Sequence, residues 1–310
     1  MSSGKIYFFC GFMSYVLWGI LPFFLKQIEV YPEYTLIFYR ALFVALIMST
    51  LLLINVKKTV KWLSVLKRAT ARQLITTMVL SMLGGTFLVF NWICYIYTVN
   101  NVSIHSASFS YLLSPIMTAF LAVICLGERL NKYKWAAIGL SILSCYLLGH
   151  VSFHELFYVV VIALTYSLFV ITQKRNTLLA RPVSLALQMF TGALVMLCFH
   201  PFSQAGVPLD AHFWIYISIV AAFFTASPLI LNLYAMNGMQ ASQLTYLTYL
   251  NPMIGFSIGI MMFHEKIDKA SFTAYSFLLV AIVIFNWDWI EKIFRRRAPA
   301  LSVEAEKETT

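Results

Sequence analysis

The amino-acid sequence predicts an all-α, polytopic membrane protein of about ten transmembrane helices, arranged as two inverted five-helix repeats. Hydrophobic residues make up 61% of the 310 residues and charged residues only 11%, whereas an ordinary soluble domain carries about 25% charged residues. A soluble fold of this length could not bury so much apolar surface, but lipid solvates it. Each crossing takes roughly 20 mostly apolar residues, so the chain has room for about ten.

Apolar runs bounded by charges and turn residues define the spans in chain order. The first run follows the N-terminal MSSGK without a small-residue cleavage site, so we expect a retained helix rather than a signal peptide. The fifth and seventh runs are short for a perpendicular crossing and need support from neighbours or local thinning of the bilayer. Between the second and third runs, 57–72 predicts a basic stretch at the membrane interface. The predicted spans are 6–26, 34–55, 74–98, 103–126, 135–150, 156–173, 184–200, 212–234, 241–263 and 271–290.

The positive charges of the loops predict that both termini are cytoplasmic and that the number of spans is even. With the N-terminus inside, inner loops and tails hold 18 of the 22 Lys and Arg residues, and the outside holds only Lys26, Lys266 and Lys269. The inner loop at 236–241 is an exception, because it has no positive residue. We attribute the net charge of +10 to topology and to contact with anionic lipid headgroups, and we expect no nucleic-acid partner.

The cysteines, histidines and acids indicate neither a metal nor a cofactor, and they disfavour catalysis. The five cysteines lie in apolar stretches without close pairs, so we expect them to be packing residues. The six histidines fall at the predicted outer ends of spans, where His150 and His154 could share a helix face but have no third ligand nearby. Every Asp and Glu falls in a loop, at a span end or in a tail, so no acid lies at a reacting depth. The same absence leaves the coupling ion or driving force open, because ion-driven carriers commonly hold a buried carboxylate.

An internal repeat divides the chain into two units, about 1–150 and 151–297, followed by a polar tail at 298–310 that we expect to be disordered and cytoplasmic. Five spans per unit force the second unit to enter the membrane upside down. Inverted repeats give transporters two related conformations around a site near the midplane; the alternative is a duplicated scaffold that transports nothing. A displacement of 137 residues places Tyr97 on Tyr234, Asn100 on Asn237, Pro115 on Pro252, Glu128 on Glu265, Arg129 on Lys266 and Lys132 on Lys269.

Two prolines, Pro115 and Pro252, fall near the centres of the fourth and ninth predicted spans, where we expect them to kink the helix. Each removes one helical hydrogen bond, and a carbonyl freed in lipid needs a protein partner or a water-filled cavity. Polar residues precede both prolines. They either line a central cavity or pack helices together through weak hydrogen bonds. The candidates for substrate binding in these runs are Tyr111, Ser114, Tyr246, Tyr249 and Asn251.

Arg40 is the only clear charge inside a predicted span, about 9 Å from the outer end of the second span at roughly 1.5 Å per residue. No acidic residue lies near the mid-membrane to neutralise it. One interpretation is a structural arginine that snorkels or bonds to carbonyls. The other is that Arg40 meets a carboxylate or phosphate of the substrate.

Aromatic and amide side chains inside the spans complete the candidate substrate-binding set. Tyr39 and Gln188 occupy a similar place in the two units if the second span aligns with the seventh. Aromatic residues of a membrane protein also face lipid or anchor at an interface, so lipid contact is the alternative for each. The remaining candidates are Trp18, Asn91, Trp92, Tyr95 and Tyr166.

Several motifs occur in a recognisable order: YVLWGILPFFLK in the first span, Asn91 with Trp92, VNN at 99–101, and Pro115 followed by LGER at 126–129. In order and spacing they resemble the RarD-type permeases of the EamA-type drug/metabolite transporter superfamily, over essentially the whole chain. The resemblance implies ten helices, two inverted EamA-like units and a central cavity lined by both. It also implies transport of an amino-acid-like, nucleotide-like or drug-like metabolite, usually as export across a bacterial inner membrane.

Three positions depart from the RarD-type pattern. Such sequences usually carry an acid where Ser106 stands, an Asn where Ser114 stands and a His where Tyr39 stands, so this chain has fewer titratable groups on the implied pathway. We expect a divergent, multi-pass secondary transporter whose partners are a small organic solute and membrane lipids. Export by alternating access is the leading hypothesis. Uptake or exchange, a non-transporting scaffold or receptor, and an intramembrane enzyme are the alternatives.

Overall fold

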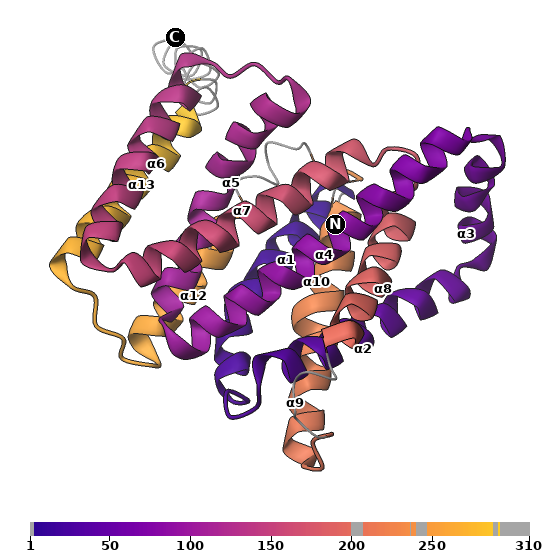
Figure 1. Ribbon diagram of the computed structural model, residues 1–310, viewed down its shortest axis with the longest axis horizontal. Coiled ribbons are helices and arrows are strands. Elements are labelled where there is room, and N and C mark those ends of the chain that lie inside the picture. The colour runs from indigo at the N-terminus through magenta and orange to yellow at the C-terminus, as the bar shows by residue number, and fades with distance from the viewer. Residues whose placement is uncertain (1–2, 200–206, 236, 240–246, 288–290, 292–310) are drawn as a thin grey trace, which may run out of the picture.

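The computed structural model describes residues 3–199, 207–235, 237–239, 247–287 and 291, and across these residues it is helical without strands (Figure 1). The prediction of an all-α protein is therefore confirmed. The elements are α1 (Ser3–Lys26), α2 (Glu33–Ile54), α3 (Val56–Leu63), the 3₁₀ turn η1 (Ser64–Arg68), α4 (Ala71–Asn101), α5 (Ile104–Leu126), α6 (Lys132–Val151), α7 (Phe153–Arg175), α8 (Arg181–Phe199), α9 (Ala211–Ala221), the π-helical turn η3 (Ala222–Ala226), α10 (Ser227–Ala235), α12 (Leu250–Met261) and α13 (Lys269–Phe285).

Seven of the described helices are long and apolar enough to cross a membrane, and α12 and α13 are shorter apolar helices. The seven are α1, α2, α4, α5, α7, α8 and the continuous run from α9 through η3 to α10. Helix α6 covers the fifth predicted span. The ninth, 241–263, begins outside the described residues, which resume at 247. The count of ten spans therefore stays a prediction.

Side-chain caps set several helix boundaries. Thr70, Ser103, Asn131 and Ser152 each accept a hydrogen bond from a backbone N–H three residues further on, at the starts of α4, α5, α6 and α7. Such caps satisfy backbone donors that have no partner inside the helix. The turns they allow are short, since only Val102 and Ser103 separate α4 from α5 and a single residue separates α6 from α7. Little non-helical backbone is therefore left to satisfy at these turns.

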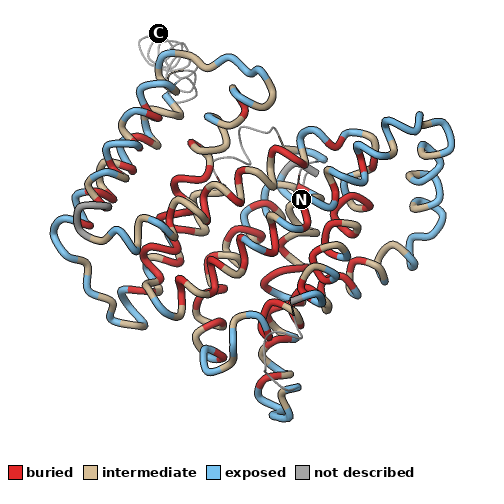
Figure 2. The backbone as a smooth tube through the Cα atoms, in the orientation of Figure 1, coloured by how far each residue is buried: buried red, intermediate tan, exposed pale blue. Residues whose placement is uncertain are grey.

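Many large hydrophobic side chains are exposed, whereas many small polar residues are buried. Figure 2 shows that buried and exposed positions alternate along most helices. In lipid, helices associate through close packing and hydrogen bonds rather than through the hydrophobic effect. The Ser144 hydroxyl, for example, donates to the Ala274 carbonyl at 2.5 Å and ties α6 to α13, the pair that runs along one edge of the molecule (Figure 1). At the opposite edge, α3 and η1 connect α2 to α4, and none of their residues is buried.

Each helix of the first half packs on the second half in the same way as its counterpart in the second half packs on the first. The first half supplies α1, α2, α4, α5 and α6 in order, and the second supplies α7, α8, α9 to α10, α12 and α13. Helix α1 packs on α10 and α12, the third and fourth of the other half. Helix α7 likewise packs on α4 and α5. The second helices of the two halves pack on each other (α2 on α8), and so do the fourth helices (α5 on α12) and the fifth helices (α6 on α13). The two halves are thus interleaved.

Glycines allow α4 and α8 to approach closely. A Cβ added at Gly85 would overlap the main-chain carbonyl of Gln188 and the side chain of Thr191, and one added at Gly192 would overlap Val89. Small residues at helix crossings let backbones come together in lipid. The crossing of α4 and α8, which joins the two halves, therefore depends on the missing side chains.

We predict that Gly85→Ala destabilises the folded protein, because the obstacle includes main-chain atoms that move little. Overpacking of this kind costs about 1–3 kcal/mol. Gly139 on α6 is the matched control, because a Cβ there meets nothing within 4 Å, and Ala is the better helix former. Thermal unfolding in detergent should show a lower midpoint for Gly85→Ala and an unchanged or higher one for Gly139→Ala. Equal midpoints would contradict the packing described.

Candidate functional site

Six of the residues selected from the sequence lie together across four helices and form an arginine–tyrosine cluster. Arg40 comes from α2, Tyr111 from α5 and Tyr166 from α7. Asn91, Trp92 and Tyr95 fall on successive turns of α4, so that one helix supplies half of the group. A cation–π contact joins Arg40 to Trp92, and ring contacts and a hydrogen bond join Tyr111 to Tyr95, Tyr166 and Asn91. The two groups meet because Arg40 lies close enough to Tyr95 and Tyr111 for an electrostatic interaction with both.

Arg40 is buried, with 2% of its surface exposed, so it does not snorkel to the membrane surface. Its guanidinium carbon lies 4.2 Å from the centroid of the Trp92 ring, a geometry in which the ring face attracts a cation. Its Nε donates to Thr225 Oγ1 at 2.9 Å, and Nη1 has no partner among the described residues. The Trp92 ring and Thr225 therefore hold the guanidinium without a carboxylate.

Thr225 was not selected from the sequence. It lies in the π-helical turn η3, where its Oγ1 donates to the carbonyl of Val220 at 2.9 Å. Single π-turns inside α-helices are frequent at functional sites. Local sequence carries no signal for such a turn beyond a run of small residues, and the contact with Arg40 spans 185 positions.

Asn91 holds one of the tyrosines, Tyr111, and Tyr111 contacts the other two. The Tyr111 hydroxyl donates to Asn91 Oδ1 at 3.0 Å, while Asn91 Nδ2 donates to the carbonyl of Ile162 and to Thr165 Oγ1 at 2.8 and 3.2 Å. The ring centroids of Tyr95 and Tyr111 are 5.2 Å apart, and those of Tyr111 and Tyr166 are 5.5 Å apart. Asn91 is buried, whereas the rings of Tyr111 and Tyr166 keep part of their surface accessible. Asn91 thus orients the Tyr111 ring, and the rings of Tyr111 and Tyr166 both stay partly accessible.

Three other candidates have neighbours outside this cluster. Trp18 is half-buried on α1, with its ring 5.3 Å from that of Tyr15. Tyr39 packs against Phe213 and Trp214 of α9, with ring centroids 5.5 and 4.8 Å away. Gln188 is fully buried where α8 meets α4 and α7, and its Oε1 accepts from Gln173 Nε2 at 2.5 Å. Tyr39 and Gln188 therefore sit in helix interfaces.

Ser114, next to Pro115 within α5, is buried and donates to the carbonyl of Ser110 at 2.8 Å. Its own carbonyl accepts from Ser167 Oγ of α7 at 3.2 Å. This residue therefore contributes to packing between α5 and α7 as well as to the environment of the proline.

Pro252 lies in the first turn of α12, and the preceding part of its predicted span, up to residue 246, lies outside the described residues, so the expected kink stays a prediction. The first N–H groups of a helix have no acceptor within it, so a proline there costs no hydrogen bond. Tyr249 precedes this helix, and its hydroxyl accepts from Asn286 Nδ2 at 3.3 Å. The carbonyl of Asn251 lies against Gly19 of α1. Tyr246 lies outside the described residues.

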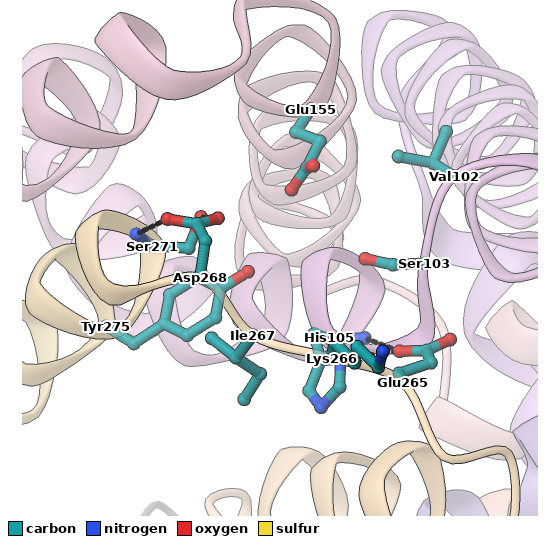
Figure 3. A pocket seen from close by; sticks show the side chains of 10 residues that line it. All are labelled: Val102, Ser103, His105, Glu155, Glu265, Lys266, Ile267, Asp268, Ser271 and Tyr275. Atoms are coloured by element: carbon teal, nitrogen blue, oxygen red, sulfur yellow. Dashed lines mark hydrogen bonds and ion pairs between the residues drawn. The ribbon is translucent and has the colours of Figure 1, made fainter.

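A second group of polar residues lines a cavity of about 240 Å³ between the α4–α5 turn, the start of α7 and the loop from α12 to α13 (Figure 3). Glu155 projects from α7, and Asp268 and Tyr275 come from the start of α13. The Ser106 hydroxyl donates to Glu155 Oε2 at 2.6 Å. A carboxylate therefore lies beside Ser106, the position where RarD-type sequences carry an acid.

Glu265, in the loop before α13, binds the N-terminus of α5 and so joins the two halves. Its Oε1 accepts from the Ile104 N–H at 2.8 Å, and its Oε2 accepts from the His105 N–H at 3.2 Å and contacts His105 Nδ1 at 2.5 Å (Figure 3). Burial opposes ionisation, but the His105 ring and the two backbone donors outweigh it and lower the pKa of Glu265. A carboxylate at a helix N-terminus is also favoured by the helix dipole. We name this contact the Glu265 latch.

Comparison with known proteins gives a family match in both halves. A family model described as the EamA-like transporter family matches residues 5–149 and again residues 154–287. An uncharacterized transporter of Pseudomonas aeruginosa is 27% identical over 287 residues, which cover 90% of this chain and 92% of that protein. Protein RarD of Streptomyces exfoliatus is 25% identical over 303 residues, or 96% and 92% of the two chains. Protein RarD of Escherichia coli is 23% identical over 282 residues, or 89% and 92%.

A solved crystal structure of a protein also superposes on this chain with a TM-score of 0.61 at 16% identity, covering 92% of this chain and 98% of the other. At that identity the likeness shows a shared fold alone. The seven apolar helices and the transporter relatives together make this chain a multi-pass membrane protein.

We predict that the stability supplied by the Glu265 latch is lost in acid. Its carboxyl has a lower pKa folded than its ordinary value of 4.5, so ionisation stabilises the fold fully above that value and progressively less as the pH falls through the folded pKa. The thermal midpoint of Glu265→Gln should lie below that of the unmodified protein at pH 7, and the gap should narrow below pH 4.5.

Glu29→Gln is the control for this pH series, because Glu29 is paired with Lys26 on the surface. Exposed pairs contribute little to stability, so this change should leave the pH profile unaltered. Glu155, Asp268 and Lys266 line the same cavity, but they are present in both proteins and cancel in the difference. A gap that stays constant from pH 7 to pH 3 would contradict the prediction.

Proposed function

This chain belongs to the EamA-like transporter family and is a RarD-like permease, and on that premise we propose that it moves a small organic metabolite across a bacterial inner membrane by alternating access. The solute is amino-acid-like, nucleotide-like or drug-like. Export is the proposed direction, with uptake or exchange as the alternative. Both termini are proposed to be cytoplasmic, as the loop charges predict.

The observation that carries this proposal is the exchange symmetry of the helix packing. Each half presents its first helix to the third and fourth helices of the other, and the second, fourth and fifth helices meet their counterparts. The separate family matches to the two halves support the same division of the chain. Two units related in this way give two conformations of similar energy, each open to one side.

The arginine–tyrosine cluster is the proposed solute site. It draws on three helices of the first half and on α7, the first helix of the second half. A solute between these helices therefore contacts both units and responds to their relative movement. Partly accessible aromatic rings offer contact area for an organic solute, while Asn91 fixes the orientation of Tyr111.

The Glu265 latch is proposed to close one end of this pathway. It connects the loop before α13 in the second half to the start of α5 in the first. If the two halves move against each other, this contact forms in one conformation and breaks in the other.

We predict that Tyr166→Ala lowers transport at least about tenfold while the protein still folds, because it removes an aromatic face from the solute site. Tyr34→Ala is the matched control, since Tyr34 is an exposed tyrosine on α2. Uptake of a panel of radiolabelled amino acids, nucleosides and aromatic drugs into proteoliposomes measures both variants, with size-exclusion profiles as the test of folding. Equal transport by the two variants would show that the arginine–tyrosine cluster is not part of the transport pathway.

We also predict that joining residues 105 and 265 stops transport. In a chain whose five native cysteines are replaced by serine, His105→Cys with Glu265→Cys is treated with a short bifunctional methanethiosulfonate reagent. Flux should fall to the background of empty vesicles and return after reduction, because the bridge prevents movement between the halves.

The matched bridge joins Glu33→Cys to Asn101→Cys, two residues whose side chains hydrogen-bond at 2.8 Å within the first half. Because both belong to one unit, transport should survive this bridge. Loss of transport with both bridges, or with neither, would argue against movement of one half against the other.

A further inference from the structure

The guanidinium of Arg40 is buried without a carboxylate partner in the part of the chain that the structure describes. Among the described residues no carboxylate forms an ion pair with it, since the ion pairs there join Lys26 to Glu29, His105 to Glu265 and Lys174 to Glu128. Arg40 nevertheless has only 2% of its surface exposed. A buried charge without a partner is unfavourable, so this position needs a reason beyond stability.

The surroundings of Arg40 hold its cation in place and leave a donor free. Thr225 Oγ1 accepts a hydrogen bond from Nε, the guanidinium carbon lies over the Trp92 ring, and Nη1 has no partner in the described part of the chain. Tyr111 and Tyr166 of the same cluster keep part of their surface accessible. A charge-assisted hydrogen bond to an anion is about twice as strong as a neutral one, so the free donor favours an anionic group.

We propose that Arg40 binds the carboxylate of the transported solute, which is an organic monoanion with an apolar or aromatic body. This rests on the proposed function and names its substrate class. One carboxylate neutralises the one arginine, so the loaded site carries no net charge through the membrane interior. A phosphate monoester would bring a second negative charge. The only other Lys or Arg within a predicted span is Lys26, which lies at the outer end of its span and is paired with Glu29.

The same charge balance identifies a driving force for export. Over a complete transport cycle Arg40 returns to its starting state and only the solute is transferred. Export of a monoanion therefore moves one negative charge from the negative interior of a bacterium to the positive outside, and the membrane potential favours it. The site needs no buried carboxylate for proton coupling, because the solute itself supplies the charge. Neutral analogues of the same shape would neither match Arg40 nor respond to the potential.

The test uses matched pairs of solutes, each a carboxylate and its neutral primary amide: N-acetyl-L-phenylalanine, N-acetyl-L-tryptophan and indole-3-acetate with their amides. Binding to the purified full-length protein is read by thermal shift, and flux is measured in proteoliposomes with and without a potassium diffusion potential. We expect each bound carboxylate to be preferred over its amide at least tenfold, and its flux to follow the potential.

The variants are Arg40→Met, Arg40→Lys and, as control, Arg68→Met on the exposed η1 turn. Arg40→Met should reduce the preference to less than twofold, and Arg40→Lys should lose most of it, because an ammonium lacks the planar set of donors. The ligand-free midpoint of Arg40→Met should equal or exceed that of the unmodified protein, since an unpaired buried charge has gone. A purely structural arginine would give a lower midpoint with the preference unchanged.

The outcomes separate this inference from the transporter proposal. Flux of amides equal to that of carboxylates, unaffected by Arg40→Met, would overturn the carboxylate site and leave the transporter standing. Carboxylate binding that disappears in Arg40→Met, without flux of any solute, would support the site and overturn transport. Neither binding nor flux of any pair would overturn both.

Discussion

The absence of water in the lipid interior governs this molecule, because every polar group placed there must find its partner within the protein. The helix starts show the consequence. Ser103 and Ser152 cap helices across turns of one or two residues, and Glu265 supplies further acceptors to the start of α5 from the other half of the chain. A contact that satisfies a backbone requirement thus also connects the two halves, and the gate that we propose lies at this start of α5.

Hydropathy and residue type were enough to predict the helices and to select all six residues of the arginine–tyrosine cluster. Arg40 stood out as a charge in an apolar run, and Asn91, Trp92 and Tyr95 stood out as polar or aromatic residues on one helix. The signals that failed concern long-range pairing. Nothing local marks Thr225 as the acceptor for Arg40, or places Tyr39 against α9 and Gln188 against the glycines of α4.

The positions of Pro252 and of the Glu265 latch were also beyond local reasoning. A proline looks the same in the sequence wherever it falls in an apolar run, and only the structure places Pro252 in the first turn of α12. Glu265 was visible as the repeat counterpart of Glu128, yet its role depends on a contact over 161 positions. The acid beside Ser106 shows the same limit, since Glu155 supplies it from another helix.

The two halves pack alike but differ in sequence, and one difference places a charge in the first half only. In the first two helices of each half the repeat needs a different displacement, of 148 residues, which places Trp18 on Tyr166 and Arg40 on Gln188. Both residues lie on the second helix of their half and face the third helix of the other, and each has one terminal side-chain nitrogen without a partner among the described residues. Arg40 is a cation that lies over the Trp92 ring, whereas Gln188 is a neutral amide that lies beside Gly84 and Gly85. In the transport cycle that we propose, matching contacts elsewhere keep the two conformations close in energy, and the charge of Arg40 then decides which solute, and which movement of charge, the carrier favours.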